Sequence, residues 1–361
     1  MRIGLIAPPW LPVPPPKYGG TEAVVDRLAR GLLARGHQVV LFATGDSTCP
    51  VPLLWVYEEA QRPLLGQVVV ELRQLIHAYD ALQDCDIVHD HTVAGPVYAL
   101  RYQDLPVVVT AHGAFEGGIN DLYRAVADRV PVIAVSHHQA STAPIEAVAV
   151  IHHGIDLDLW PVGPGGGDYY CYVGRMAPYK GAREAALIAL QAGVRLLLAA
   201  KMDEPAEQEY FHTEVEPLLG DGIEFLGEIG GERHARLLGD AIGLINPISW
   251  DEPFGLVMVE ALACGTPVLA FPRGAAPEIV RDGAGGLLCQ DIAEAVRRLP
   301  ELAGLDRSAV RAEAEAHFST ERMVDEHLAV YASVIAGRGV SREQRPRVVV
   351  DLTDATPAQA H

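Results

Sequence analysis

The sequence predicts an α/β protein in which two doubly wound parallel sheets face each other across a cleft. Short, continuously apolar segments alternate with helical segments in two separate series along the 361 residues. Strands that are apolar at nearly every position are typical of parallel sheets covered by helices on both faces. A Gly/Pro-rich stretch at 161–168, "PVGPGGGD", separates the two series and marks the predicted domain boundary. A chain of this length has room for two domains of ordinary size.

The first series begins with an apolar strand near the N-terminus. "RIGLIA", residues 2–7, is followed by a Pro-rich loop and by a helix from about Thr21, whose side chain we expect to cap it. Apolar residues recur in this helix at helical spacing, and Gly36 is its expected end. Further apolar strands are expected at 38–43, 86–91, 106–113 and 131–136. Together these segments predict an N-terminal domain over residues 1–160.

The second series follows the Gly/Pro stretch directly. It opens with the strand "YYCYVG" at 169–174 and a helix from about Ala182. Four more short strands are expected at 194–200, 223–227, 241–247 and 267–271. They predict a C-terminal domain over 161–316, then a helix over 317–337. The charged, Pro-containing tail at 338–361 is expected to be partly flexible.

Composition excludes several classes of protein. The formal net charge is −19, and without a run of Lys or Arg this repels nucleic acid. No segment reaches eighteen consecutive apolar residues, so we expect no membrane span. We interpret "MRIGLIAPPW" as a first strand rather than a signal peptide. The five cysteines form no C-x-x-C pair, which predicts reduced core thiols of a cytoplasmic protein.

Metal motifs are missing from the sequence pattern. Neither H-E-x-x-H nor a Cys/His cluster occurs in it. The strand segment "HDH" places His89 and His91 on one face and Asp90 on the other, which disfavours a three-ligand metal site there. The sequence therefore predicts no metal site and no cofactor.

Polar and glycine residues follow several strands at their carboxyl ends, where open parallel sheets bind ligands. "YVGRMAPYKG" places Arg175 and Lys180 beyond one strand, and two cations at this spacing can grip two phosphates. "KYGGTE" offers Gly19 and Gly20, which allow a ligand to approach the backbone closely. "TAHG" places His112 at the same rim. A solvated basic loop, a plain glycine loop and a structural histidine remain the alternatives.

The segment "WDEPFGLVMVEALACGTPVLA", residues 250–270, carries two glutamates at the edges of an apolar run. Pro253 disfavours helix at Glu252, so the glutamate lies in the loop that leads into a helix, whereas Glu260 lies inside that helix. Eight positions at about 1.5 Å each place the two carboxylates roughly 10 Å apart. Two acids for hydroxyls and a helix N-terminus for phosphate suggest a nucleotide sugar. The alternative is an exposed loop acid and a solvated helix acid.

These residues together resemble the family 4 retaining glycosyltransferases, which have the GT-B architecture of two Rossmann-like domains. The similarity covers most of the chain, and the E-x7-E segment with its flanking P-F-G and A-C-G-T-P-V is quite specific. The matching stretches are "PPWLPVPPPKYGGTE", "DIVHDHTVAGP", "VVVTAHGAF", "AVSHHQ", "YVGRMAPYKG", "LINPISWDEPFGLVMVEALACGTPVLAFPRGAAPEIVRDGAGGLL" and "FSTERMVDEHLAVY".

The resemblance implies roles for single residues on the C-terminal side. Arg175 and Lys180 match the pair that holds the donor diphosphate and stabilises the leaving group, and Gly174 precedes them among the donor-binding residues. Glu260 matches the glutamate that accepts hydrogen bonds from the ribose hydroxyls. Glu252 matches the one near the donor sugar and is counted as catalytic with Arg175 and Lys180.

Two loops are also assigned by the resemblance. Phe254, Gly255 and Leu256 match the loop whose backbone N–H groups approach the sugar and the phosphate. Gly19 and Gly20 match the mobile N-terminal loop over the diphosphate. The late helix matches one that crosses back to the first domain.

One further match and two departures complete the comparison of motifs. His112 matches a histidine beside the transferred sugar and is the fourth predicted catalytic residue. In "VIHHGID", His152 and His153 stand where Pro-Asn is more usual, which affects the expected hinge or acceptor cleft. Tyr179 stands where an acid often precedes Lys180.

The activity implied by the resemblance is transfer of a sugar from a nucleoside diphosphate to a hydroxyl, with retention of the anomeric configuration and without a metal. UDP is expected rather than GDP, on family frequency alone. The acceptor is an oligosaccharide, a lipid or a natural product, chosen by first-domain loops such as 57–66 and 115–122. The sequence shows no acid/base pair of the kind that glycoside hydrolases need.

Rival functions stay open on the sequence. Nucleotide-sugar epimerases and phosphorylases share the architecture, so the fold alone does not decide between them. A non-catalytic, two-lobed sugar-binding protein is the alternative from another class. The Arg175/Lys180 pair argues against it.

Overall fold

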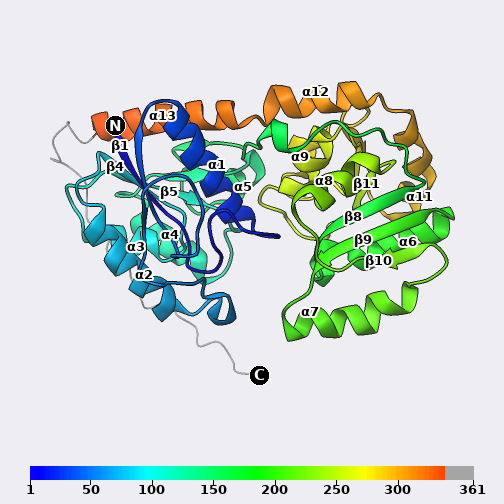
Figure 1. The fold of residues 1–361 in the computed structure, drawn as a ribbon, viewed down its shortest axis with the longest axis horizontal. Coiled ribbons are helices and arrows are strands. Elements are labelled where there is room, and N and C mark those ends of the chain that lie inside the picture. Colours follow the sequence, from blue (N-terminus) through cyan, green and yellow to red (C-terminus); the bar gives the residue numbers. More distant parts are fainter. Residues whose placement is uncertain (338–361) are drawn as a thin grey trace.

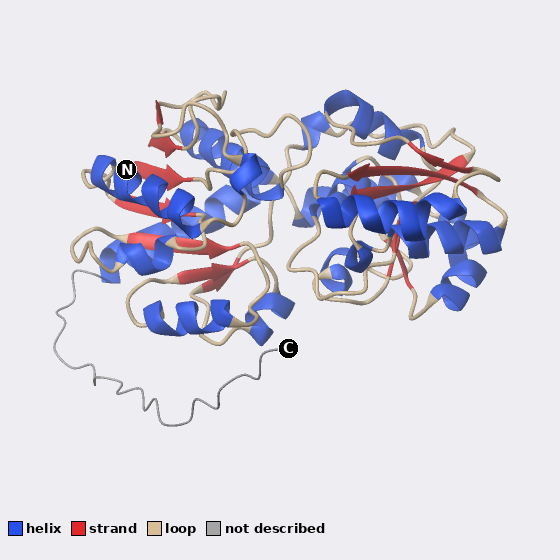
Figure 2. Cartoon of the chain, turned by 90° about the horizontal axis from the view of Figure 1, so that it is seen from below, coloured by secondary structure: helices blue, strands red, loops and turns tan. Residues whose placement is uncertain are grey.

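The computed structural model describes residues 1–337 and shows two α/β lobes (Figure 1). One lobe contains a seven-stranded sheet in the order β3-β2-β1-β4-β5-β6-β7, and the other a six-stranded sheet in the order β10-β9-β8-β11-β12-β13. Neighbouring strands are parallel throughout both sheets. Figure 2 shows each sheet between helices. The predicted fold class is therefore confirmed.

The strands of the first sheet are β1 Arg2–Ile6, β2 Gln38–Phe42, β3 Leu53–Leu54, β4 Ile87–Asp90, β5 Val107–Ala111, β6 Val132–Ala134 and β7 Ala149–Val150. Its lobe contains the helices α1 Gly20–Ala34, α2 Val68–Ala81, α3 Gly95–Ala99, α4 Gly118–Val126 and α5 His137–Thr142. The predicted strands all form. The sequence analysis missed β3 and β7, because two-residue strands at the sheet edges leave no period in the sequence.

The strands of the second sheet are β8 Tyr169–Arg175, β9 Arg195–Lys201, β10 Ile223–Phe225, β11 Leu244–Asn246, β12 Val268–Ala270 and β13 Gly286–Leu288. The helices of this lobe are α6 Ala182–Ala192, α7 Pro205–Tyr210, α8 Gly231–Asp240, α9 Leu256–Ala263, α10 Ala276–Ile279, α11 Ile292–Arg298 and α12 Arg307–His317. Here too the predicted strands form, and only the short edge strand β13 was missed.

The last described helix, α13 Thr320–Gly337, lies against the first lobe although α12 before it lies on the second (Figure 1). The Tyr331 hydroxyl is 2.7 Å from Nδ1 of His89 in β4, and Asp325 accepts two hydrogen bonds from Arg35 at the end of α1. The helix starts at Thr320, three residues later than the predicted start at 317, because Ser319 forms a parallel bridge with Ile155. The predicted tail at 338–361 lies outside the described residues.

The Gly/Pro stretch at 161–168 is bound along the second lobe. The backbone N–H groups of Gly163, Gly165 and Gly167 donate to carbonyls of Cys264, Gly239 and Asp240 at 2.8–3.0 Å. A Cβ at Gly163 would lie 2.1 Å from the Gly239 carbonyl oxygen, so only glycine allows this close approach. The stretch is thus packed in place rather than free.

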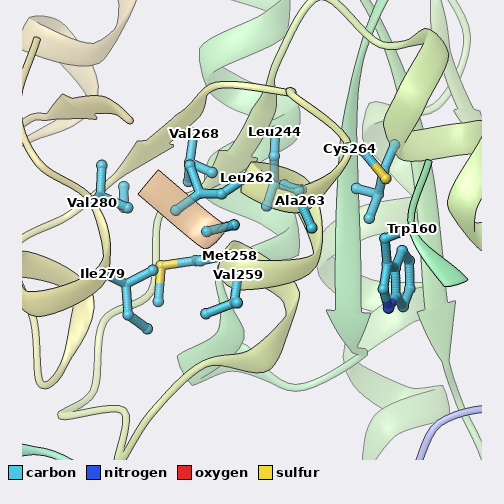
Figure 3. Close-up of a cluster of buried hydrophobic side chains, with 14 of the residues drawn as sticks. Trp160, Leu244, Met258, Val259, Leu262, Ala263, Cys264, Val268, Ile279 and Val280 are labelled. Carbon is cyan, nitrogen blue, oxygen red and sulfur yellow. The ribbon is translucent and has the colours of Figure 1, made fainter. Parts of the chain in front are cut away.

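Helix α9 is packed inside the second lobe, and this packing fixes the two glutamates of the 250–270 segment. Figure 3 shows Met258, Val259 and Leu262 of α9 among side chains of β11, β12 and α10, all of them buried. Burying each such side chain stabilises the fold by about 1.5–3 kcal/mol. Gly265, with φ 69°, ends the helix as predicted.

Two further expectations concern the whole chain. All five cysteines are buried and form no disulfide, as expected for core thiols. Within residues 1–337, no helix combines the length and the apolar character that crossing a bilayer requires.

Candidate active site

A cleft of about 2470 Å³ lies between the two lobes, at the carboxyl ends of the central strands. Both lobes contribute to its walls. The predicted site residues that line it are Gly19, Gly20, His112, Gly174, Arg175, Lys180, Glu252, Phe254, Gly255, Leu256 and Glu260. The structure therefore brings together every residue that the sequence analysis singled out for donor binding or catalysis. Their roles stay predictions.

Arg175 is the last residue of β8, and its guanidinium is held by two carboxylates. Nε pairs with Glu207 and Nη2 with Glu204, both from the start of α7. Glu207 is itself fixed, because it accepts from the backbone N–H groups of Asp203 at 2.7 Å and Glu204 at 3.0 Å. The sequence analysis missed these two acids. Their E-P-x-E spacing is that of a capping box, which the structure shows, and this was the available signal.

Lys180 ends a 3-10 turn before α6 and pairs with Glu252 across the cleft wall. Both side chains are 15% exposed. The Trp250 indole N–H donates to the same Glu252 oxygen at 3.0 Å, and Nζ of Lys180 lies 4.7 Å from the centre of the Trp250 ring. Gly181 makes the turn possible, since it has φ 83° and a Cβ there would lie 2.3 Å from the Pro247 carbonyl oxygen.

Glu260 projects from α9 toward the first lobe. Its Oε1 lies 3.7 Å from Nη2 of Arg27 in α1, and its Oε2 lies 3.9 Å from Nε2 of His234 in α8. Burial lowers the pKa of His234, so this imidazole is neutral at pH 7. Only 12% of the Glu260 side chain is exposed. Neither Glu260 nor Glu252 is therefore a solvated acid. The sequence analysis missed Arg27 because this residue lies in the other domain.

The loop before α9 is shaped by its glycine and its aromatic ring. Gly255 is the N-cap of α9, in the left-handed region at φ 100°, and no side chain caps the first N–H groups of the helix, whose first residues line the cleft. Phe254 is buried, and its ring packs edge-on against His153 at 5.0 Å between centroids. A loop with free N–H groups at a helix start favours an anion nearby.

The glycine pair of the first lobe sits opposite this loop. A Cβ on Gly20 would lie 3.5 Å from Leu256 Cδ1, so the two loops are in contact. A Cβ on Gly19 would come within 2.7 Å of Pro15, which excludes other residues there. The predicted cap by Thr21 is wrong. Helix α1 begins at Gly20 with Gly19 at the N-cap and no side-chain cap, since the glycine turn brings the helix start forward.

His112 is half-buried and lies at the cleft end of a histidine cluster in the first lobe whose other members are buried. Its Nε2 is 2.9 Å from Nδ1 of His91, and its ring stacks on that of His153 with centroids 5.2 Å apart. The His91 ring in turn lies against that of His89, with centroids 4.0 Å apart and planes tilted by 37°. Asp90 lies on the other side of β4 and accepts from the Tyr79 hydroxyl at 2.8 Å, so the predicted alternation of "HDH" is confirmed.

Burial keeps this histidine cluster uncharged. It lowers the pKa of His112 to about 3 and that of His327 to about 4. It also lowers the pKa of His89, His91 and His153 well below the ordinary value. At neutral pH the two rings that line the cleft, His112 and His153, therefore offer neutral hydrogen-bond donors and acceptors to it.

The molecule has two facing parallel α/β domains, with cations and helix N-termini at the cleft between them. This arrangement is that of the GT-B class of glycosyltransferases. Residues 18–159 match the model "Glycosyltransferase Family 4", and residues 167–303 match the model "Glycosyl transferases group 1". The two matches together span most of both lobes.

Known proteins agree with this class. The chain is 27% identical over 319 residues to the phosphatidyl-myo-inositol mannosyltransferase of Mycobacterium leprae, covering 80% of this chain and 83% of that protein. It is 27% identical to AviGT4, a glycosyltransferase involved in avilamycin A biosynthesis, with a TM-score of 0.72 over 93% of this chain and 98% of the other. HepE of Anabaena, solved in complex with UDP and glucose, shares the fold at 21% identity and a TM-score of 0.74, covering 92% of this chain and 100% of HepE.

The chain belongs to glycosyltransferase family 4 and is a glycosyltransferase with the GT-B fold. The family predicted from the motifs is therefore confirmed.

Proposed function

We propose that this chain transfers a sugar from a nucleoside diphosphate sugar to a hydroxyl acceptor, with retention of configuration and without a divalent cation. The observation that carries the proposal is the arrangement of Arg175 and Lys180 at the carboxyl end of β8, beside the open helix start of α9. These cations face the glycine loop of the other lobe across the cleft. Such a site suits a diphosphate between the lobes.

Negative charge develops on the diphosphate as the bond to the sugar breaks. Preorganised donors aimed at that charge are usually the largest single contribution to catalysis. Arg175 is already oriented by Glu204 and Glu207 in the free protein, whereas Lys180 must exchange its Glu252 partner for the diphosphate. The diphosphate competes with Glu252 for Lys180, and the freed Glu252 carboxylate is then available to hydroxyls of the sugar.

The sugar would lie between the two walls, next to His112. A neutral imidazole can hydrogen-bond a hydroxyl without placing a second positive charge beside the developing oxocarbenium-like centre. In the same-face mechanism the acceptor enters from the side of the leaving phosphate, and a phosphate oxygen takes its proton. This step needs no protein base.

The donor base and the acceptor are the finer parts of the proposal. We propose UDP over GDP, supported by family frequency and by the UDP complex of HepE, whose fold this chain shares. The acceptor carries a hydroxyl on an oligosaccharide, a lipid or a natural product.

A thermal-shift screen of nucleoside diphosphates and nucleotide sugars tests the donor. A ligand at 100 times its dissociation constant adds about 2.7 kcal/mol of stability, so the matching nucleotide should stand out. Release of free sugar from that donor without any acceptor then separates an enzyme from a pure binding protein. With an acceptor, proton NMR of the anomeric coupling reports retention, and an inverted product would overturn the mechanism.

A further inference from the structure

Three metal-ligating side chains meet at the boundary between the lobes, outside the cleft lining. They are His137 at the start of α5, His152 after β7 and Glu278 in α10. One ligand atom from each lies within 4.8 Å of the others. The two histidines belong to the first lobe and the glutamate to the second. The sequence showed no such cluster, because its members come from three distant segments.

The glutamate of this group is held in place by the other lobe. Glu278 Oε2 accepts from the His137 backbone N–H at 2.8 Å, and Oε1 accepts from that of His138 at 2.7 Å. His152 Nε2 lies 2.8 Å from Oε2. These hydrogen bonds orient the carboxylate, as an anchored metal ligand requires.

The two rings are placed to complete a coordination site. His152 and His137 meet edge to face, with centroids 5.7 Å apart and planes at 88°. The His152 side chain is 20% exposed and that of Glu278 is 17% exposed, so solvent and ions have access to the group. Two imidazoles and one carboxylate form a donor set that suits Zn²⁺ and its neighbours, with a fourth position left for water. Mg²⁺ prefers an octahedron of oxygens and is disfavoured.

We propose that His137, His152 and Glu278 bind one Zn²⁺-type ion that bridges the two lobes. Binding requires that His152 Nε2 and Glu278 Oε2, which lie 2.8 Å apart, both turn lone pairs to the metal. Because the ligands come from both lobes, the bound metal stabilises the two-lobed arrangement. We assign the site no part in sugar transfer. His152 is one of the two histidines, with His153, that stand where the family more usually has Pro-Asn.

The test uses the untagged full chain, stripped with EDTA and dialysed. Calorimetric titration with Zn²⁺ should show one site per chain, and Mg²⁺ should show none. His137→Ala should weaken Zn²⁺ binding about tenfold or more. This ring is exposed, so the variant should fold normally. His212→Ala is the matched control, because His212 is exposed at the surface beside Glu216 and should leave the titration unchanged.

Two outcomes would overturn the proposal. One is a His137→Ala chain that titrates like the wild type, and the other is a His212→Ala chain that loses the same binding. Co²⁺ gives a second measurement, since its visible spectrum should show intense four-coordinate bands that His152→Asn abolishes. Neither measurement uses sugar transfer, so the result does not depend on the proposed catalytic function.

Discussion

Two parts of the cleft wall handle charge in opposite ways. The charged wall is the part of the second lobe where Arg175 and Lys180 are each paired with glutamates. The neutral wall is the part of the first lobe around His112 and His153, where burial lowers the pKa of both rings. Buried charges persist only when they are paired, whereas unpaired buried histidines lose their proton.

This difference suggests a division of tasks between the lobes. Charge is concentrated where a diphosphate would leave, and neutral hydrogen-bonding groups are concentrated where a sugar would lie. Each of the following measurements tests one side of that division.

The histidine cluster that ends at the neutral wall should be the acid-sensitive part of the molecule. Among residues 1–337, seven histidines have lowered pKa values, chiefly through burial: the cluster of His89, His91, His112, His153 and His327, together with His37 and His234. Below pH about 6.5 the unfolded chain binds more of their protons than the folded chain does, so stability falls as the pH decreases. The carboxyls of Glu22, Glu71 and Asp90 have raised pKa values, chiefly through burial, and act in the opposite direction.

Histidines with a lowered pKa outnumber the three carboxyls with a raised pKa, so unfolding takes up protons and stability should fall between pH 6 and pH 5. Each net proton taken up costs about 1.4 kcal/mol of stability per pH unit. Urea unfolding at both pH values measures this loss. An unchanged urea midpoint would show that the histidine cluster is not held neutral.

The charged wall should be the one that turnover depends on most. Lys180→Ala removes one preorganised cation and should lower kcat by about 10²–10³-fold. Arg183→Ala is the matched control, because Arg183 is exposed and lies one turn away in α6, outside the cleft lining. Equal kcat losses in the two variants would mean that general charge near the cleft, rather than Lys180 itself, matters.

Replacing Glu260 and replacing Glu252 should affect different quantities, nucleotide binding in one case and turnover in the other. Glu260→Ala should mainly weaken binding of the nucleoside diphosphate, because its contacts are the same in ground state and transition state. Glu252→Gln should lower turnover more than it weakens nucleotide binding. Losing one charged hydrogen bond costs about 1.5–3 kcal/mol, so ten- to hundred-fold effects are expected.

Calorimetric titration with UDP and GDP, combined with steady-state kinetics, distinguishes these roles. Unchanged nucleotide affinity in the Glu260→Ala protein would refute the ribose assignment. Wild-type turnover in the Glu252→Gln protein would show that the catalytic role assigned to Glu252 is wrong.

The smallest expected effect is that of metal removal. With Arg175 and Lys180 on the diphosphate, EDTA should leave the transfer rate unchanged, even if it strips an ion from the His137/His152/Glu278 group. Rates measured before and after chelation, and again with added Mg²⁺ or Mn²⁺, check this. Loss of activity restored by either ion would show that the two cations do not replace a metal.

The sequence by itself determined the layered architecture and the positions of the site residues along the chain. Apolar strands, helix ends such as Gly265, and motifs at strand ends depend on residues close together in sequence. Their effects act over one or two turns, so local patterns suffice to predict them. The same logic fails for the shortest edge strands, and it failed for Thr21, where the glycine turn set the helix start instead.

Only the tertiary structure decided which side chains meet. Arg27 reaches Glu260 from the other lobe, Tyr331 reaches His89 across 242 positions, and His153 stacks on His112. The neutral state of the histidine cluster and the bridging group at Glu278 likewise arise from burial and lobe placement. Burial and long-range pairing depend on how whole elements pack, and no local sequence pattern carries that information.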